Sequence, residues 1–188
     1  YYLGRAYGSI AKRKGAERIA VGYDGRLSSP ELAEKLAEGL TDCGLDVVEI
    51  GRGPTPMLYY SNYALDVEGG IMVTGSHNPP SHNGFKIMLF RTSFFGADIQ
   101  DLGRVAAAGE FEAGAGDSEK HRLFDAYIDR LLRDFRPGNP LKVAWDAGNG
   151  AAGEAMASLA GRLPGEHILL NETIDGTFPA HHPDPTVP

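Results

Sequence analysis

The sequence holds a single cysteine, Cys43, among 188 residues, and this excludes an intramolecular disulfide framework. One thiol in an apolar helical stretch fits a reducing compartment and predicts a core residue rather than a nucleophile. No apolar run approaches the roughly 20 residues that a membrane-spanning helix needs, and no signal-peptide pattern follows Tyr1. We therefore expect a cytoplasmic protein that does not contact membranes.

Positive charge is also scarce. Lys and Arg number 18 against 25 Asp and Glu, which gives a net charge of −7. A nucleic-acid-binding surface needs a basic patch that displaces counterions from phosphates, so we expect no nucleic acid partner. The rest of the composition, 42% hydrophobic and 23% charged, is that of an ordinary globular protein. The length suffices for about one domain and part of a second.

Strand and helix patterns alternate along the first part of the chain. Periodicity and turn residues predict a helix at 1–14, a strand at 17–23, a helix capped by Ser28 or Ser29 with Pro30 in its first turn, a strand at 45–50, a short helix through Tyr60, strands at 70–74 and 85–90, and a helix at 97–109. Strand–helix–strand units build parallel sheets. The predicted fold class is therefore α/β, with a mixed, mostly parallel sheet flanked by helices.

A domain boundary is predicted in the second part of the chain. Residues 112–119 have the composition of a linker, and an amphipathic helix follows from Phe124 to about Phe135. The Arg-Pro-Gly-Asn-Pro sequence at 136–140 breaks that helix. A strand at 141–146, a helix at 150–161 and a strand at 167–171 come next. We predict one domain at 1–136 and the first βαβ part of a second domain at 141–188.

The stretch with the most chemical content is Thr-Gly-Ser-His-Asn-Pro-Pro at 74–80, directly after a predicted buried strand. Ligands in open α/β sheets bind at the carboxyl ends of strands. Gly75 lets the backbone approach a ligand closely or take a positive φ. An activated Ser76 there could carry a covalent intermediate. A turn without chemistry is the alternative, and the heptapeptide alone does not decide between the two.

This heptapeptide resembles the phosphoserine loop of the α-D-phosphohexomutases, the phosphoglucomutase and phosphomannomutase family. The resemblance implies that Ser76 is phosphorylated, gives its phosphoryl group to a hexose phosphate and takes one back from a bisphosphate intermediate. Segments 24–30, 83–87, 143–150 and 175–185 also resemble the family, in register. Together the matches favour the bacterial phosphomannomutase/phosphoglucomutase branch, with phosphoglucosamine mutase as the nearest alternative.

The resemblance also implies roles for residues near Ser76. Lys86 would transfer protons between the sugar hydroxyl and the phosphoserine, and His77 would hold the serine or its phosphate. Arg26, in an Asp-Gly-Arg turn before a helix, and Asn78 would bind phosphate or substrate; an arginine beside a helix N-terminus suits an anion. A solvated lysine, a surface arginine and an exposed histidine are the open structural alternatives.

The strand at 85–90 bears on the direction of Lys86. Phe85, Ile87 and Leu89 share one face because strand side chains alternate. If these three pack on the core, Lys86 points away from it. The sequence leaves open whether that direction is the side of Ser76.

Cofactors and partners follow from the resemblance as well. It implies Mg²⁺ on the phosphate of Ser76, a glucose 1,6-bisphosphate-type activator, a mannose or glucose phosphate substrate and a monomer. The other metal ligands, in an Asp-x-Asp-x-Asp-Arg loop, and the sugar- and phosphate-recognition loops should lie beyond Pro188. The chain is therefore expected to be a fragment, cut at Tyr1 and Pro188. A folded domain that is inactive alone is a further hypothesis.

A different class of function is suggested by Gly-Asn-Gly-Ala-Ala-Gly at 148–153. It is formally a G-x-G-x-x-G turn after a strand, with Glu172 downstream, as in nicotinamide-dinucleotide-binding domains. Asp146 and Ala147 separate the apolar part of the strand from the first glycine. The family resemblance gives these glycines turn and packing roles. The adjacent His181 and His182 invite a metal-site interpretation, but the resemblance makes their segment a connecting loop.

Overall fold

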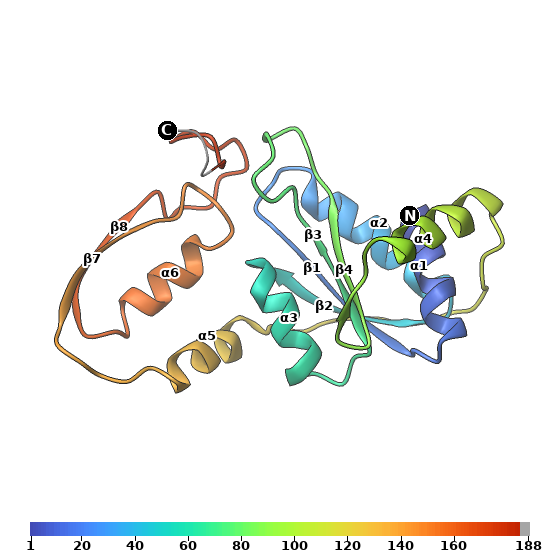
Figure 1. Ribbon diagram of the computed structural model, residues 1–188, viewed down its shortest axis with the longest axis horizontal. Helices are drawn as coiled ribbons and strands as arrows, with labels where there is room; N and C mark the ends of the chain where they lie inside the picture. The colour runs from blue at the N-terminus through green and yellow to red at the C-terminus, as the bar shows by residue number, and fades with distance from the viewer. Residues whose placement is uncertain (185–188) are drawn as a thin grey trace.

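The computed structural model describes residues 1–184; the predicted motif that ends at Pro185 and the predicted second domain that ends at 188 extend beyond them. The described elements confirm the α/β class (Figure 1). In chain order they are α1 (Tyr2–Arg13), β1 (Arg18–Tyr23), α2 (Ser29–Thr41), β2 (Asp46–Arg52), α3 (Thr55–Ala64), β3 (Gly69–Val73), β4 (Phe85–Leu89), β5 (Thr92–Ser93), α4 (Ala97–Ala108), β6 (Ser118–Lys120), α5 (Phe124–Arg133), β7 (Leu141–Asp146), α6 (Gly153–Ala160) and β8 (Gly165–Leu170).

The main sheet has six strands in the order β5-β4-β3-β1-β2-β6. The pairs β1–β2, β1–β3 and β2–β6 are parallel, whereas β4 runs antiparallel to β3 and β5 antiparallel to β4. This is the mixed, mostly parallel sheet that the sequence predicts. The strands β7 and β8 form a separate two-stranded parallel sheet.

Helices cover both faces of the main sheet. Figure 1 shows α1, α2 and α4 on one side and α3 on the other, with α5 leading to the second sheet. The alternation of β1 produces two cores, since Ile19 and Val21 pack with α1 and α2 while Ala20 packs with α3 and α5. Between α1 and α2 the backbones touch at Gly4 and Gly39, where any Cβ would overlap the opposite helix.

The alternation predicted for β4 is confirmed. Ile87 and Leu89 are buried in the core shared with α1 and α2, and Phe85 packs against that core. Lys86 therefore points to the opposite side of the sheet. The core position predicted for Cys43 is also confirmed, because its side chain is fully buried.

The linker predicted at 112–119 is wrong. Ser118 begins β6, which extends the sheet beside β2. The preceding glycines lie against the turn between α2 and β2, since a Cβ on Gly114 would come within 2.7 Å of Gly44 Cα and one on Gly116 within 2.0 Å of Leu45 O. The small residues of this segment therefore allow close packing and do not serve as a flexible spacer. The sequence did not predict β5, because a strand of two residues is too short to show an alternating pattern.

The helix α5 connects the two sheets. Its Tyr127 ring lies 6.0 Å from the Tyr60 ring of α3, and Ile128 shares a core with Ala155 of α6. Residues 134–140 contain no helix or strand. Because α5 packs against elements on both sides, the predicted division at 136–140 stays a prediction. Within residues 1–184, every helix is too short or too polar to cross a membrane.

Two glycine variants test the packing of the 114–116 segment. A Cβ at Gly103, on the exposed face of α4, would meet nothing within 4 Å, so Gly103→Ala should raise the free energy of unfolding by about 0.5–1 kcal/mol. Gly116→Ala should lower it by about 1–3 kcal/mol, because the new methyl group overlaps the Leu45 carbonyl. Urea denaturation measures both. A Gly116→Ala protein as stable as the parent would mean that this segment is a free linker.

Candidate functional site

Loops at the carboxyl ends of four parallel strands meet around one cavity of about 620 Å³. Asp24 follows β1, Thr55 follows β2, Ser76 follows β3 and Asp146 ends β7. Figure 1 shows the loop between β3 and β4 reaching toward the segment near the C-terminus. The cavity thus lies where open α/β sheets bind ligands. The helix α3 begins at this cavity, and a helix N-terminus favours negative charge.

Ser76 has an unusual backbone for a residue with a side chain. Its φ is 53°, in the left-handed region that residues other than glycine rarely adopt. Its amide donates a hydrogen bond of 3.0 Å to Thr74 Oγ1, and its hydroxyl lies 3.4 Å from Nδ1 of His77. The positive φ predicted as one possibility for Gly75 falls on Ser76, and the backbone of Gly75 lies close to the Arg26 side chain. The serine hydroxyl is thereby exposed at the cavity. The predicted close approach of Gly75 to a ligand stays a prediction.

Arg26 lies beneath this loop, and its side chain is fully buried. One terminal nitrogen donates to the carbonyls of Pro79 and His82, at 2.6 and 3.0 Å. The other donates to those of Ser76 and Asn78, at 3.0 and 2.8 Å. Arg26 does not line the cavity, and its terminal N–H groups are bound to the loop, so the predicted contact between Arg26 and phosphate stays a prediction.

Asp24 joins the same buried network. Its Oδ2 accepts the amide of Gly75 at 3.2 Å, and its Oδ1 accepts the hydroxyl of Ser29 at 2.6 Å. Asn83 donates to the hydroxyls of both Ser28 and Ser29. Neither serine makes the helix-capping bond that the sequence predicts. Their hydroxyls instead tie the start of α2 to the two ends of the Ser76 loop.

The structure brings three of the predicted site residues to the cavity. Ser76, His77 and Lys86 line it, and Lys86 is half-buried. The side that Lys86 faces is therefore that of Ser76, the point the sequence left open. Asn78 is exposed outside the cavity wall and contributes its backbone carbonyl to Arg26.

The opposite wall contains Asp146, which the sequence reasoning did not single out, and His181, whose segment it interpreted as a connecting loop. Asp146 Oδ2 lies 3.3 Å from Nε2 of His181. Hydrogen bonds from the Asn171 side chain and then from the Gly148 amide lower the pKa of Asp146. The His182 carbonyl, and next the Asp146 carboxylate, raise the pKa of His181. The rule about carboxyl ends of strands, applied to β1, β2 and β7 as well as β3, would have found this wall.

Two glycines of the 148–153 segment are in close contact with other parts of the chain. Gly148 has a φ of 52°, and a Cβ there would come within 2.7 Å of the His181 ring. A Cβ on Gly153 would come within 1.8 Å of the Glu172 carbonyl. These contacts are the turn and packing roles expected for the family, and the turn also lines the cavity through Gly148 and Gly150.

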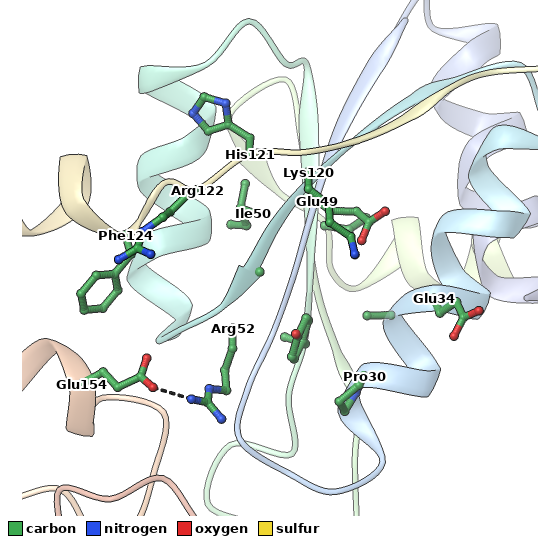
Figure 2. A pocket seen from close by; sticks show the side chains of 14 residues that line it. Pro30, Glu34, Glu49, Ile50, Arg52, Lys120, His121, Arg122, Phe124 and Glu154 are labelled. Carbon is green, nitrogen blue, oxygen red and sulfur yellow. Dashed lines mark hydrogen bonds and ion pairs between the residues drawn. The ribbon is translucent and has the colours of Figure 1, made fainter.

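A second, larger cavity of about 940 Å³ lies beside β2 and β6. Figure 2 shows its mixed charges, with an ion pair between Arg52 of β2 and Glu154 of α6. Glu49 and Lys120 are opposite each other on the paired strands β2 and β6. None of the predicted site residues lines it. Its size alone therefore does not make it the candidate site.

The comparisons with known proteins agree with this geometry. The sequence profile of phosphoglucomutase/phosphomannomutase, alpha/beta/alpha domain I, matches residues 1–101. The chain belongs to this family. The resemblance found in the motifs is thus confirmed.

Relatives match beyond domain I as well. The chain is 42% identical, over 188 residues, to the phosphomannomutase/phosphoglucomutase of Pseudomonas aeruginosa PAO1, and 42% identical, over 190 residues, to the phosphoglucomutase of Neisseria gonorrhoeae. Each match covers all of this chain and 41% of the relative. A solved phosphoglucomutase/phosphomannomutase family protein from Burkholderia thailandensis is 43% identical with a TM-score of 0.93, over 98% of this chain and 42% of that one. The chain spans about two fifths of the length of these relatives.

The Asp146–His181 pair predicts a titration with a definite sign. A raised pKa keeps His181 protonated to higher pH than an ordinary histidine. Its contribution to stability is complete below the pKa of the unfolded chain and is lost as pH rises through the folded value. In NMR titrations the His181 midpoint should lie above that of a free histidine, and Asp146→Asn should lower it part of the way, since the His182 carbonyl remains. An unchanged midpoint in Asp146→Asn would rule out the pair.

Proposed function

We propose that this chain is the first part of a phosphohexomutase that interconverts the 1-phosphates and 6-phosphates of mannose and glucose, with Ser76 as the phosphoryl carrier. The observation that carries the proposal is the placement of Ser76. Its exposed hydroxyl, held in a left-handed backbone, shares a cavity with Lys86 and His77 in a member of this family. The names of the relatives support the reaction class.

Each phosphoryl transfer exchanges one phosphorus–oxygen bond for another. The bond from phosphorus to the sugar hydroxyl oxygen forms as the bond to Ser76 Oγ breaks, and the hydroxyl proton ends on Ser76 Oγ. Lys86 is placed on the same side of the sheet to carry this proton, and its positive charge attracts the transferred group. The ring of His77, 3.4 Å from the hydroxyl, orients it. The second transfer runs in reverse from the other end of the bisphosphate.

The bisphosphate must turn around between the two transfers. A cavity of about 620 Å³ falls within the usual range of small-molecule sites and leaves room for a sugar with a phosphate at each end. A glucose 1,6-bisphosphate-type activator would phosphorylate Ser76 and prime the enzyme. We propose a cytoplasmic monomer without nucleic acid or membrane partners.

A magnesium ion is part of the proposal. Hard cations prefer carboxylate and phosphate oxygens, and the ion would neutralise the phosphate on Ser76. Residues 1–184 contain no cluster of three or more His, Cys, Asp or Glu side chains arranged to hold a metal. The phosphate on Ser76 would thus supply one ligand, and the family's Asp-x-Asp-x-Asp-Arg loop, outside this chain, the others. For the same reason we expect residues 1–188 alone to be inactive.

Substitution of the carrier and of its proton donor tests this function in the complete protein. Ser76→Ala should abolish turnover of glucose 1-phosphate and mannose 1-phosphate, because no oxygen is left to hold the phosphoryl group. Lys86→Met should lower kcat/KM by about 100- to 10,000-fold, the range for loss of general acid–base catalysis. Phosphorus NMR follows the appearance of the 6-phosphate.

The matched control is Ser81→Ala, a second exposed serine in the same loop, which should keep wild-type turnover. Ser76→Ala protein that converts either sugar at the wild-type rate would contradict the proposal. If wild type converts only glucosamine 1-phosphate, the sugar assignment changes to phosphoglucosamine mutase and the role of Ser76 stands.

A further inference from the structure

The exposed part of the Ser76 loop depends on a buried cation. Residues 76–82 are all exposed, and few backbone hydrogen bonds hold them, among them Asn78 N to Gly75 O and His82 N to Pro79 O. Four of the loop's carbonyl oxygens point inward to the terminal nitrogens of Arg26. A planar guanidinium presents its donors in a fixed fork, so it can hold several acceptors in one arrangement.

Gly75 shows how closely the loop and this side chain fit. A Cβ on Gly75 would come within 2.4 Å of both Cζ and Nε of Arg26. The backbone before Ser76 thus lies directly on the guanidinium, and only glycine allows it. The next residue, Ser76, has the strained left-handed backbone. A strained conformation persists only where its surroundings enforce it, and the contact between Gly75 and Arg26 is part of those surroundings.

Two further groups fix the guanidinium itself. Asp24 Oδ2 lies 3.3 Å from Nε of Arg26 and also accepts the Gly75 amide, so one carboxylate holds both the cation and the loop. The Phe178 ring, from the segment after β8, stacks over the guanidinium at 5.2 Å from Cζ to the ring centroid. Arg26 is therefore held by Asp24, directly after β1, and by Phe178 from the second part of the chain.

We propose that Arg26 is a positioning residue that sets the direction of the Ser76 hydroxyl by clamping the carbonyls of residues 76–82. The inference rests on the proposed function, since it assigns Arg26 a part in phosphoryl transfer by Ser76. It replaces the direct contact with phosphate that the sequence predicts. Arg26 touches neither the sugar nor the phosphate, and so acts through the loop.

Arg26→Lys in the complete protein is the first test. Lysine keeps the charge, but its single nitrogen cannot reach four carbonyls. We expect kcat to fall about 100-fold, the cost of a misplaced reacting group, while KM for the hexose phosphate stays close to wild type. Hydrogen exchange of the loop amides at 75–84 should become faster, while exchange in β1 and β3 stays unchanged. Arg104→Lys, at an exposed arginine of α4, is the matched control and should behave as wild type.

Gly75→Ala tests the same contact from the loop side and guards against a variant that fails to fold. Its methyl group pushes on the guanidinium, so the loss of kcat with KM retained and the faster loop exchange should recur. A wild-type kcat in both variants would overturn the proposal. So would faster exchange that extends equally over β1 and β3, because it would mean that Arg26 only stabilises the fold.

The two proposals fail in different ways. If the wild-type protein lacks mutase activity while Arg26→Lys frees the loop amides, the proposed reaction is wrong and the clamp on the loop stands. If wild type is active and Arg26→Lys changes neither kcat nor loop exchange, the reaction stands and the positioning role is wrong.

Discussion

A buried guanidinium is the interaction on which the candidate site depends. Burying an arginine is strongly destabilising when its charge is left uncompensated. The two terminal nitrogens of Arg26 are bound by four carbonyls of one loop, and the carboxylate of Asp24, 3.3 Å from Nε, balances the charge, although Nε makes no hydrogen bond within residues 1–184. The same contacts that satisfy the cation remove the freedom of the loop. The contacts that stabilise the buried charge are therefore the same contacts that order the backbone around Ser76.

The parallel sheet explains why the other site residues meet there. Parallel strands end at the same edge, and the turns after β1, β2 and β3 supply Asp24, Thr55 and Ser76 to one cavity. The antiparallel strand β4 returns from that edge and brings Lys86 beside them. The second sheet adds a wall with Asp146 and His181. Charges of both signs thus surround the cavity.

Much of the fold is predictable from local sequence. The helices and longer strands carry apolar residues at helical or alternating spacing, and the residues that pack, such as Leu36 and Leu40 in α2, are those the spacing indicates. The strand β6 was missed because Ser118 to Lys120 are all polar and exposed, and only pairing with the distant β2 makes them a strand. The small residues before β6 have the composition of a linker, but Gly114 and Gly116 pack closely against Gly44 and Leu45.

The candidate site was also predictable only where local sequence encodes it. Ser76 and Lys86 lie in short motifs, so the sequence identifies them and the structure brings them to one cavity. The burial of Arg26 depends on acceptors 50 to 56 residues further along the chain, which no local pattern encodes. An arginine in a turn beside a helix N-terminus suits an anion or points to solvent, and neither alternative predicts a guanidinium buried under a loop.

The most direct measurement is to locate the phosphate. The complete protein would be incubated with glucose 1,6-bisphosphate, digested and mapped by mass spectrometry. The account predicts phosphate on Ser76, absent from Ser28, Ser29 and Ser81, and removed when hexose 6-phosphate is added. An active protein with phosphate on another residue, or with Ser76 unmodified throughout turnover, would contradict it.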